Sequence, residues 1–237
     1  MSRPPTGLLV LVALVGAAAG YYSFRLVGSA SRPSGPVPAA SVPTAAPASP
    51  GTEVPDDEQA PAATPVPAEV PEVTIPDMAG KPHQLREANG HERLFNFWAT
   101  WCEPCRREIP LLNGLQQQYS AEGLQVVGIA IDERAAVQQF LKKTPMHYQL
   151  LVGEEGGYEA AQKFGMALAL PFSVFADADN RIIAVKLGEL HGDEAAAIFA
   201  NMRALRAGTT TFEAARQSIA EALKNLATER AKQKAVE

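Results

Sequence analysis

Cysteine, tryptophan and histidine are scarce in this chain of 237 residues, which contains two, two and four of them respectively. Two cysteines allow one disulfide at most, so a small scaffold built on several disulfides is excluded. The formal net charge is −5, and no dense run of Lys and Arg occurs, so we expect no nucleic-acid partner. The hydrophobic fraction of 46% is sufficient for one domain with a well-formed core and for additional segments.

One long hydrophobic run is present, and it lies at the N-terminus. Residues 7–24 carry no charge and include Ser23 as the one clearly polar side chain. A helix of this length spans about 27 Å, close to the hydrocarbon thickness of a bilayer. The run predicts either an uncleaved signal anchor over residues 1–27 or a signal peptide cleaved at a small-residue site. We expect the anchor, because the run is long and a tether follows it; in both cases the rest of the chain is exported.

The tether is the segment 28–71, which is rich in proline and alanine and poor in large hydrophobic side chains. Such a segment cannot form a core, so it is predicted to be disordered or polyproline-like. Fully extended, it would reach on the order of 130 Å at about 3.1 Å per residue.

Residues 72–207 alternate between hydrophobic strand patterns and helical patterns. Two runs, 94–98 and 124–131, are hydrophobic except for Asn96 and Gln125, as in strands buried on both faces of a parallel sheet. The expected strands are 73–77, 94–98, 124–131, 148–152, 172–176 and 181–187, and the expected helices are 103–119, 133–143, 157–164 and 192–205. This β-α-β-α then β-β-α order predicts an α/β domain with a central mixed β-sheet flanked by helices.

A C-terminal helical extension follows over residues 208–237. Its helix is expected from about residue 211 to 231, with Thr210 and Glu213 in a capping box at its start. The hydrophobic stripe at helical spacing consists of Phe212, Ile219, Leu223 and Leu226. The stripe is compatible with packing on the domain, with a solvated helix, or with docking of a partner.

The two cysteines enclose Glu103 and Pro104, directly after the strand expected at 94–98. A thiol at a helix N-terminus is stabilised as thiolate by unpaired N–H groups and the helix dipole. A second thiol one turn later can attack the resulting mixed disulfide and release the partner. The pattern predicts a redox-active disulfide, with Cys102 as the attacking thiol and Cys105 as the resolving thiol.

Three other uses of such a cysteine pair fit this sequence less well. A structural disulfide across two residues would close too small a loop to add much stability. A zinc site would need two further ligands, and the histidines show no paired spacing, so no metal is expected. A c-type haem would require a histidine after Cys105, where the chain has Arg106.

The stretch 96–105, which reads NFWATWCEPC, resembles the active-site sequence of thioredoxin-fold proteins. In particular it resembles the membrane-anchored TlpA/ResA-like thiol–disulfide oxidoreductases of bacterial cell envelopes, over about residues 73–206. The resemblance implies a thioredoxin-like fold, no cofactor, and a single-pass protein of the inner membrane with its catalytic domain in the periplasm. It also implies disulfide-containing exported substrates, of the cytochrome c or copper-site maturation type, and a transmembrane thiol electron donor.

The resemblance also assigns residues around the dithiol. Pro171 matches the cis-proline of the fold, and a cis bond there would expose the backbone of Leu170 to an extended substrate. Leu170 and Phe172 depart from the more usual Val- or Thr-Pro-Thr, which leaves substrate choice open; a trans-proline at a strand start is the alternative. Trp101 and Pro104 are expected to line the substrate site.

Proton transfer to the resolving thiol needs an acid–base group. Asn96 stands where thioredoxin has a buried acid, and an amide cannot take a proton. Glu108, three residues after Cys105, can serve instead and matches a glutamate of ResA-like members. The alternative is a solvated surface carboxylate.

Two rival functions use the same dithiol. A Cu(I)-binding and delivery module would exploit two adjacent soft thiolates. A thiol-dependent peroxidase would need a Pro-x-x-x-Thr-x-x-Cys arrangement, which Thr100 does not satisfy because it lies two residues before Cys102.

Glu103 places a negative charge beside the thiols, which raises their pKa values and favours a reductant.

Overall fold

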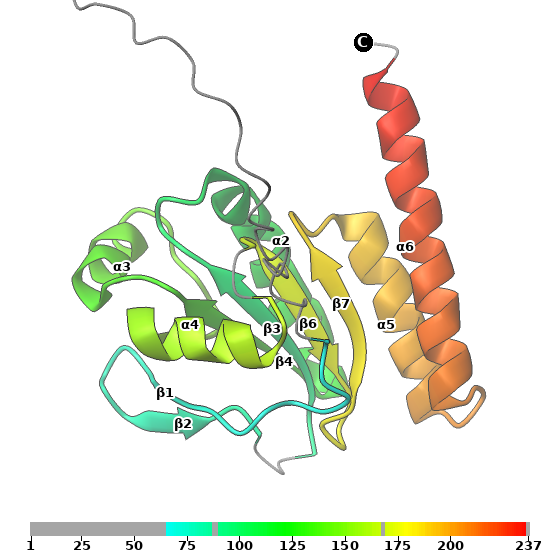
Figure 1. Ribbon diagram of the computed structural model, residues 1–237, viewed down its shortest axis with the longest axis horizontal. Coiled ribbons are helices and arrows are strands. Elements are labelled where there is room, and N and C mark those ends of the chain that lie inside the picture. Colours follow the sequence, from blue (N-terminus) through cyan, green and yellow to red (C-terminus); the bar gives the residue numbers. More distant parts are fainter. Residues whose placement is uncertain (1–64, 87–89, 167–168, 236–237) are drawn as a thin grey trace, which may run out of the picture. The chain divides into compact units, whose positions relative to one another are not determined.

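The computed structural model describes residues 65–86, 90–166 and 169–235 (Figure 1). The expected anchor, and the expected tether as far as residue 64, lie outside these ranges. None of the helices in the described ranges combines the length and hydrophobicity needed to cross a bilayer.

A five-stranded mixed sheet forms the centre of the domain, with the strand order β5-β4-β3-β6-β7. Its strands are β3 (Glu92–Trp98), β4 (Leu124–Ala130), β5 (Gln149–Val152), β6 (Phe172–Ala176) and β7 (Ile182–Leu187). Strands β3, β4 and β5 run parallel, whereas β6 and β7 are antiparallel to their neighbours. The mixed sheet expected from the order of elements is therefore confirmed.

Helices cover both faces of this sheet. The helices are α2 (Glu103–Tyr119), α3 (Arg134–Leu141), α4 (Glu154–Lys163) and α5 (Gly192–Arg206), and the 3-10 turn η1 (Ser120–Glu122) follows α2. Leu112 of α2 and Phe199 of α5 share one hydrophobic cluster with Leu94, whereas Ala160 of α4 shares another with Phe95. Neighbouring residues of β3 thus face opposite layers, and α4 lies in front of the sheet in Figure 1.

The structured part of the chain begins earlier than the sequence indicated. Ala68 accepts a hydrogen bond from Ile182 N at 2.8 Å, and Val70 N donates to Asn180 O at 2.9 Å. Val70 is fully buried. Residues 68–70 therefore belong to the domain and not to the tether expected over 28–71.

A small antiparallel hairpin, β1 (Thr74–Pro76) with β2 (Pro82–Gln84), precedes the main sheet. The sequence predicted only a turn after β1, because the three residues of β2 show no hydrophobic alternation. The turn is held by Asp77, whose Oδ1 accepts from the backbone of Ala79 at 2.8 Å and of Lys81 at 2.9 Å.

Helix α4 begins at Glu154, three residues before the expected start. The two glycines in its first half obscured the helical pattern in the sequence. Gly157 is needed there, because a Cβ atom would lie 3.1 Å from Cγ1 of Ile131 and 3.3 Å from the carbonyl oxygen of Ala130. The glycine lets α4 approach the end of β4 closely.

The C-terminal helix α6 (Phe212–Lys234) packs against the domain. Ala215 and Ile219 are buried in the hydrophobic cluster shared with α5. Its N-cap is Thr211, which accepts from Ala214 N at 3.2 Å. The capping box expected from Thr210 and Glu213 is not formed, because the helix begins one residue later than that box requires.

Candidate active site

Cys102 is the N-cap residue of α2, and Cys105 lies in the first turn of that helix. Their Sγ atoms are joined in a disulfide 1.98 Å long, with the Cα atoms 5.3 Å apart. Cys102 retains 6% of its surface exposed, whereas Cys105 retains none. An incoming thiol or disulfide therefore meets the sulfur of Cys102 first.

The backbone before the disulfide is fixed by a carboxylate that the sequence analysis missed. Asp132 lies two residues after the end of β4 and accepts from the backbone N of Thr100 at 2.8 Å and from its Oγ1 at 2.6 Å. An acidic residue at the carboxyl end of a strand parallel to β3 is the signal that could have identified it. Cys102 N in turn donates to Ala99 O at 3.2 Å, which closes the turn that presents the cysteine.

The Leu170–Pro171 peptide bond is cis. Pro171 is buried, and its carbonyl oxygen accepts from Gly188 N at 2.9 Å. Leu170 is partly buried and packs against the hydrophobic cluster that contains Cys102 and Cys105. The trans alternative considered for Pro171 is therefore wrong.

Two large hydrophobic side chains near the disulfide are exposed. Trp101, directly before Cys102, is 70% exposed. Leu187 is 52% exposed and pairs in register with Phe172, the residue after Pro171. The sequence predicted Trp101 as a contact residue, but Leu187 was missed because it looked like an ordinary strand residue. Pro104 is half-buried in the first turn of α2.

Glu108 is buried, with 1% of its surface exposed, so the alternative of a solvated carboxylate is wrong. Asn96 Nδ2 donates to its Oε1 at 2.7 Å, and Leu190 N donates to its Oε2 at 2.8 Å. Asn96 also donates to Ser173 Oγ at 3.2 Å. Asn96 thus orients the carboxyl group of Glu108.

Burial raises the pKa of Glu108 from 4.5 to about 7. The hydrogen bonds from Leu190 and Asn96 favour the charged form and lower the pKa, but by less than burial raises it. The charge of Glu189 raises the pKa further, and that of Lys186 lowers it. Near neutral pH this carboxyl group can therefore both accept and release a proton.

Arg107 neutralises much of the negative charge beside the dithiol. It pairs with Glu103 at 3.1 Å and with Glu189 at 2.7 Å. Glu103 is exposed as well as paired, so its effect on the thiols is smaller than the sequence suggested.

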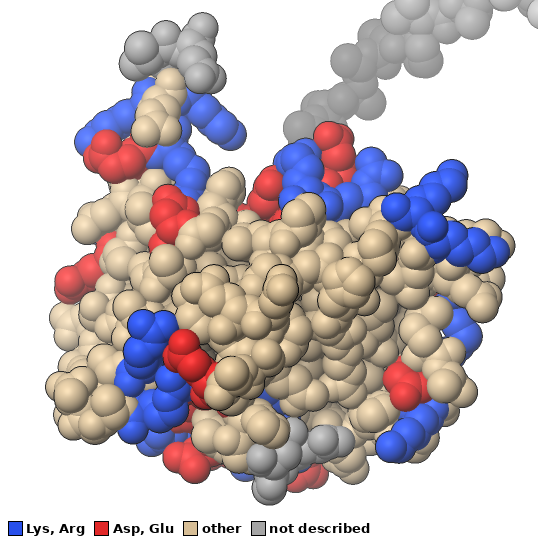
Figure 2. Space-filling model, turned by 180° about the vertical axis from the view of Figure 1, so that it is seen from behind, with Lys and Arg blue, Asp and Glu red and all other residues tan. Residues whose placement is uncertain are grey.

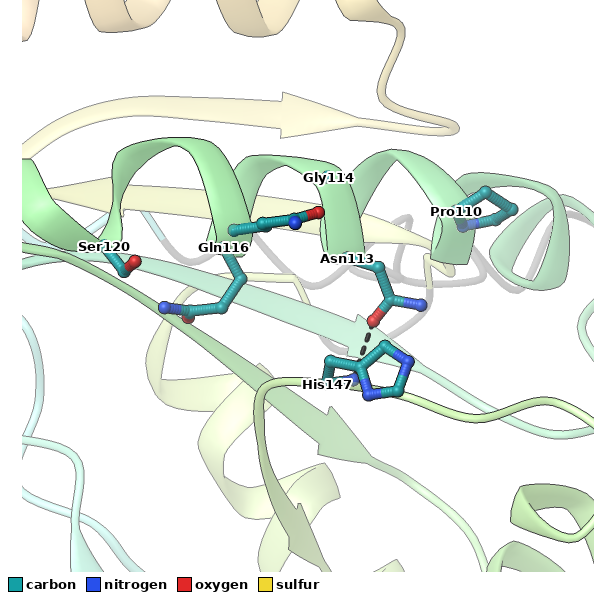
Figure 3. A pocket seen from close by; sticks show the side chains of 7 residues that line it. Pro110, Asn113, Gly114, Gln116, Ser120 and His147 are labelled. Carbon is teal, nitrogen blue, oxygen red and sulfur yellow. Dashed lines mark hydrogen bonds between the residues drawn. The ribbon is translucent and has the colours of Figure 1, made fainter.

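Away from the disulfide, α2 presents an uncharged face. Lys, Arg, Asp and Glu gather around the margin of a wide area on the rear of the molecule (Figure 2). A groove of about 870 Å³ lies along α2 beside His147, whose backbone N donates to Asn113 Oδ1 at 2.7 Å (Figure 3). Neither cysteine lines this groove.

Within the ranges that the structure describes, no group of three or more His, Cys, Asp or Glu residues is placed to hold a metal ion.

A mixed sheet of this order, with a cysteine pair at the start of the helix after its central strand and a cis-proline opening the next strand along the sheet, defines a thioredoxin-like fold. A disulfide with one accessible sulfur at that place is typical of proteins that exchange thiols and disulfides. Residues 63–200 match the family model described as Redoxin. The chain therefore belongs to the Redoxin family and is a TlpA/ResA-like thiol–disulfide oxidoreductase.

Similar proteins include thiol-disulfide oxidoreductase ResA of Bacillus thuringiensis, 32% identical over 122 residues that cover 51% of this chain and 69% of the relative. Thioredoxin-like protein YneN of Bacillus subtilis is 33% identical over 92 residues, which cover 37% of this chain and 54% of YneN. Among solved structures, a thiol:disulfide interchange protein DsbE from Chlorobium tepidum superposes with a TM-score of 0.50 at 24% identity, covering 67% of this chain and 98% of that one. That likeness supports the fold.

Proposed function

We propose that this protein reduces disulfide bonds in exported proteins, on the periplasmic side of the inner membrane to which its N-terminal helix anchors it. Cys102 is the attacking thiol, Cys105 the resolving thiol, and Glu108 the group that accepts the proton of Cys105. The observation that carries the proposal is the unequal exposure of the two sulfurs at the start of α2. Only such an arrangement lets one sulfur bind the substrate while the other stays ready to release it.

The reaction begins with both cysteines reduced. The thiolate of Cys102 attacks one sulfur of the substrate disulfide, forms a mixed disulfide and displaces the other substrate sulfur as a thiolate, which takes up a proton. Cys105 passes its proton to the Glu108 carboxylate and attacks Cys102 Sγ. The mixed disulfide breaks, and the substrate leaves with two thiols. The chain is left with the Cys102–Cys105 disulfide seen in the structure, and a transmembrane thiol electron donor restores the dithiol.

Substrate binding on this surface uses both backbone and hydrophobic contacts. An extended substrate segment pairs with the backbone of Leu170 beside Pro171, in the manner of an added strand. Trp101, Pro104 and Leu187 supply hydrophobic contact area around the disulfide. Substrates of this shape are unfolded segments with paired cysteines, as in the maturation of cytochrome c or of copper sites.

Reduction of insulin by the purified full chain, with a dithiol as electron source, tests this proposal. Turnover is expected in the wild type and absent in Cys102→Ser. Ser218→Ala, at an exposed position of α6, serves as the control that keeps turnover. The assay is repeated with a Cu(I) chelator, because a copper-delivery module would lose its function when the chelator removes its Cu(I). Turnover that survives in Cys102→Ser, or that disappears with the chelator, contradicts the proposal.

The direction of the reaction is tested separately by a redox titration of the cysteine pair. A reductant is expected to have a midpoint well below about −200 mV. A midpoint above that value would indicate an oxidase.

A further inference from the structure

The C-terminal helix α6 lies outside residues 63–200, which match the family model, and its last turns contact the start of α5. Arg230 Nη1 donates to Glu194 Oε1 at 2.6 Å, and Arg230 Nη2 donates to Asp193. Both acidic residues lie in the first turn of α5. Arg230 therefore joins the end of α6 to the start of α5.

Glu194 is a buried carboxylate whose side chain is 2% exposed. A charge so deeply buried is stable only when cations and hydrogen-bond donors surround it. Arg230 lies at 2.6 Å and Lys186 Nζ at 3.6 Å, the His191 ring contacts Oε2 through Nδ1 at 3.3 Å, and His191 N donates to Oε2 at 3.0 Å. Arg230 is the closer cation, so Lys186 is left with a distant contact to Glu194.

Lys186 uses its ammonium group to hold the loop between β7 and α5 instead. Its Nζ donates to Leu187 O at 2.6 Å and to Glu189 O at 3.1 Å. The same loop bonds to Pro171 through Gly188 N and to Glu108 through Leu190 N. One short segment thus touches both the cis-proline and the buried carboxyl group.

We infer that Arg230 is a positioning residue for Glu108, because by pairing with Glu194 it leaves Lys186 free to hold the loop that presents the Leu190 N–H to Glu108. The catalytic use of this arrangement depends on the function proposed above for Glu108. The C-terminal helix then takes part in the active site and is not only a packing element.

Several groups face Glu108 from the elements around it. Asn96 on β3 and Leu190 in the loop donate hydrogen bonds, and Lys186 and Glu189 contribute opposite charges. Tyr148, just before β5, stays neutral, because burial holds its pKa above the usual range. Of these groups, Lys186 and Leu190 respond to Arg230.

Replacing Arg230 by glutamine has a defined consequence. Glu194 loses its nearer cation and attracts Lys186 away from the carbonyl oxygens of Leu187 and Glu189. The loop loosens, so Glu108 loses part of the Leu190 hydrogen bond and part of the field of Lys186. Both losses favour the protonated carboxyl, so the pKa of Glu108 rises, by roughly 0.5 to 1 pH unit, or about three- to ten-fold in the protonation ratio.

The test is a pH titration of the Glu108 carboxyl carbon by ¹³C NMR in the full chain with its disulfide intact. The resonance is assigned by its loss in Glu108→Gln. In Arg230→Gln the midpoint should rise as stated. In Lys232→Gln, which removes a cation of the same turn that pairs with Glu229 of its own helix, the midpoint should stay at the wild-type value.

Two further variants separate positioning from simple packing. Arg230→Gln combined with Glu194→Gln should return the midpoint towards the wild-type value, because no carboxylate then withdraws Lys186. Lys186→Gln should raise the midpoint without touching α6, which keeps the test open if Arg230→Gln does not fold. A midpoint in Arg230→Gln within about 0.2 pH unit of that in Lys232→Gln, or a double variant shifted as far as the single one, overturns the inference.

Insulin reduction by the same variants separates this inference from the proposed function. The midpoint of the Glu108 titration is measured by NMR without any thiol–disulfide exchange. If the midpoint moves as expected while the pH profile of turnover does not follow it, the role of Glu108 in the proposed function fails and the positioning by Arg230 stands. If Cys102→Ser retains turnover, the proposed function fails by itself.

Discussion

Glu108 shows how a single carboxyl group acquires a useful pKa from its surroundings. Water is excluded from it, and two N–H donors offset only part of the cost of its charge. The resulting pKa of about 7 makes the charged and neutral forms nearly equal in free energy at neutral pH. An acid–base group that must take a proton and return it in each cycle is best served by that balance.

The raised pKa of Glu108 predicts how stability depends on pH. Between 4.5 and about 7 the folded chain holds a proton that the unfolded chain releases. The stabilisation from this group is therefore complete below pH 4.5 and is lost as the pH rises through 7, by about 3 kcal/mol at most. The free energy of unfolding of the wild type minus that of Glu108→Gln should fall by about this amount between pH 4.5 and 8 in urea titrations. A difference that stays constant across this range would show that Glu108 is not perturbed.

Gly128 makes a second prediction at the residue scale. A Cβ atom there would lie 2.8 Å from Leu150 Cδ2 and 2.9 Å from Tyr148 Cε2; Tyr148 is buried and Leu150 is partly buried. Gly128→Ala should therefore destabilise the domain by about 1 to 3 kcal/mol through overpacking. Gly114→Ala, on the exposed face of α2 with open space around it, is the matched control and should not destabilise. Equal unfolding midpoints for the two variants would contradict the packing described here.

The sequence identified single residues where local spacing determines the chemistry. The cysteine pair and Pro171 could be predicted because their roles follow from position relative to a helix or strand start. The burial of Glu108 could not, because its donors come from Asn96, twelve residues away, and from Leu190, eighty-two residues away. Asp132 was missed because its partner Thr100 lies thirty-two residues away, and Leu187 because it looked like an ordinary strand residue.

At the scale of elements, long hydrophobic runs were predicted well and short or glycine-containing elements were not. The centres of β3 and β4 are predominantly hydrophobic because helices cover both faces of the sheet, and α2 has the expected bounds. Strand β2 carries no such pattern, because it pairs only with β1 at the periphery. Helix α4 needs its glycines in order to approach β4 closely. Helix propensity alone disfavours glycine, so it does not predict a helix at these residues.

The packing of α6 can be measured. Ile219 is 1% exposed, so Ile219→Ala should lower the free energy of unfolding by about 2 to 5 kcal/mol. Ser218→Ala, one residue earlier on the exposed side of the helix, should change it by less than about 0.5 kcal/mol. Equal effects of the two substitutions would show that α6 does not pack on the domain in solution.

At the scale of the whole molecule, the order of the elements was sufficient to predict the fold class, but not the ion pairs between the end of α6 and the start of α5. Arg230 lies beyond residue 200, where the Redoxin match ends, so the family pattern does not extend to its contact with Glu194. That contact depends on how far α6 extends along α5. Ion pairs between elements so remote in sequence leave no local signature.

The proposed anchoring also belongs to this scale. The full chain should sediment with membranes, and a protease added to spheroplasts should degrade the domain from outside. Removal of residues 2–27 should leave the domain in the cytoplasm, protected from that protease. A full chain that remains soluble, or a domain protected in spheroplasts, would contradict periplasmic anchoring.

The central claim is that Cys102 receives the substrate and Cys105 releases it. Intact mass spectrometry of the reduced Cys105→Ser chain, incubated with a disulfide peptide, tests this claim most directly. The account predicts one covalent peptide adduct on Cys102, and no accumulated adduct on the wild type, where Cys105 resolves it. An adduct that accumulates equally on the wild type, or none on Cys105→Ser, would contradict the assignment of the two thiols.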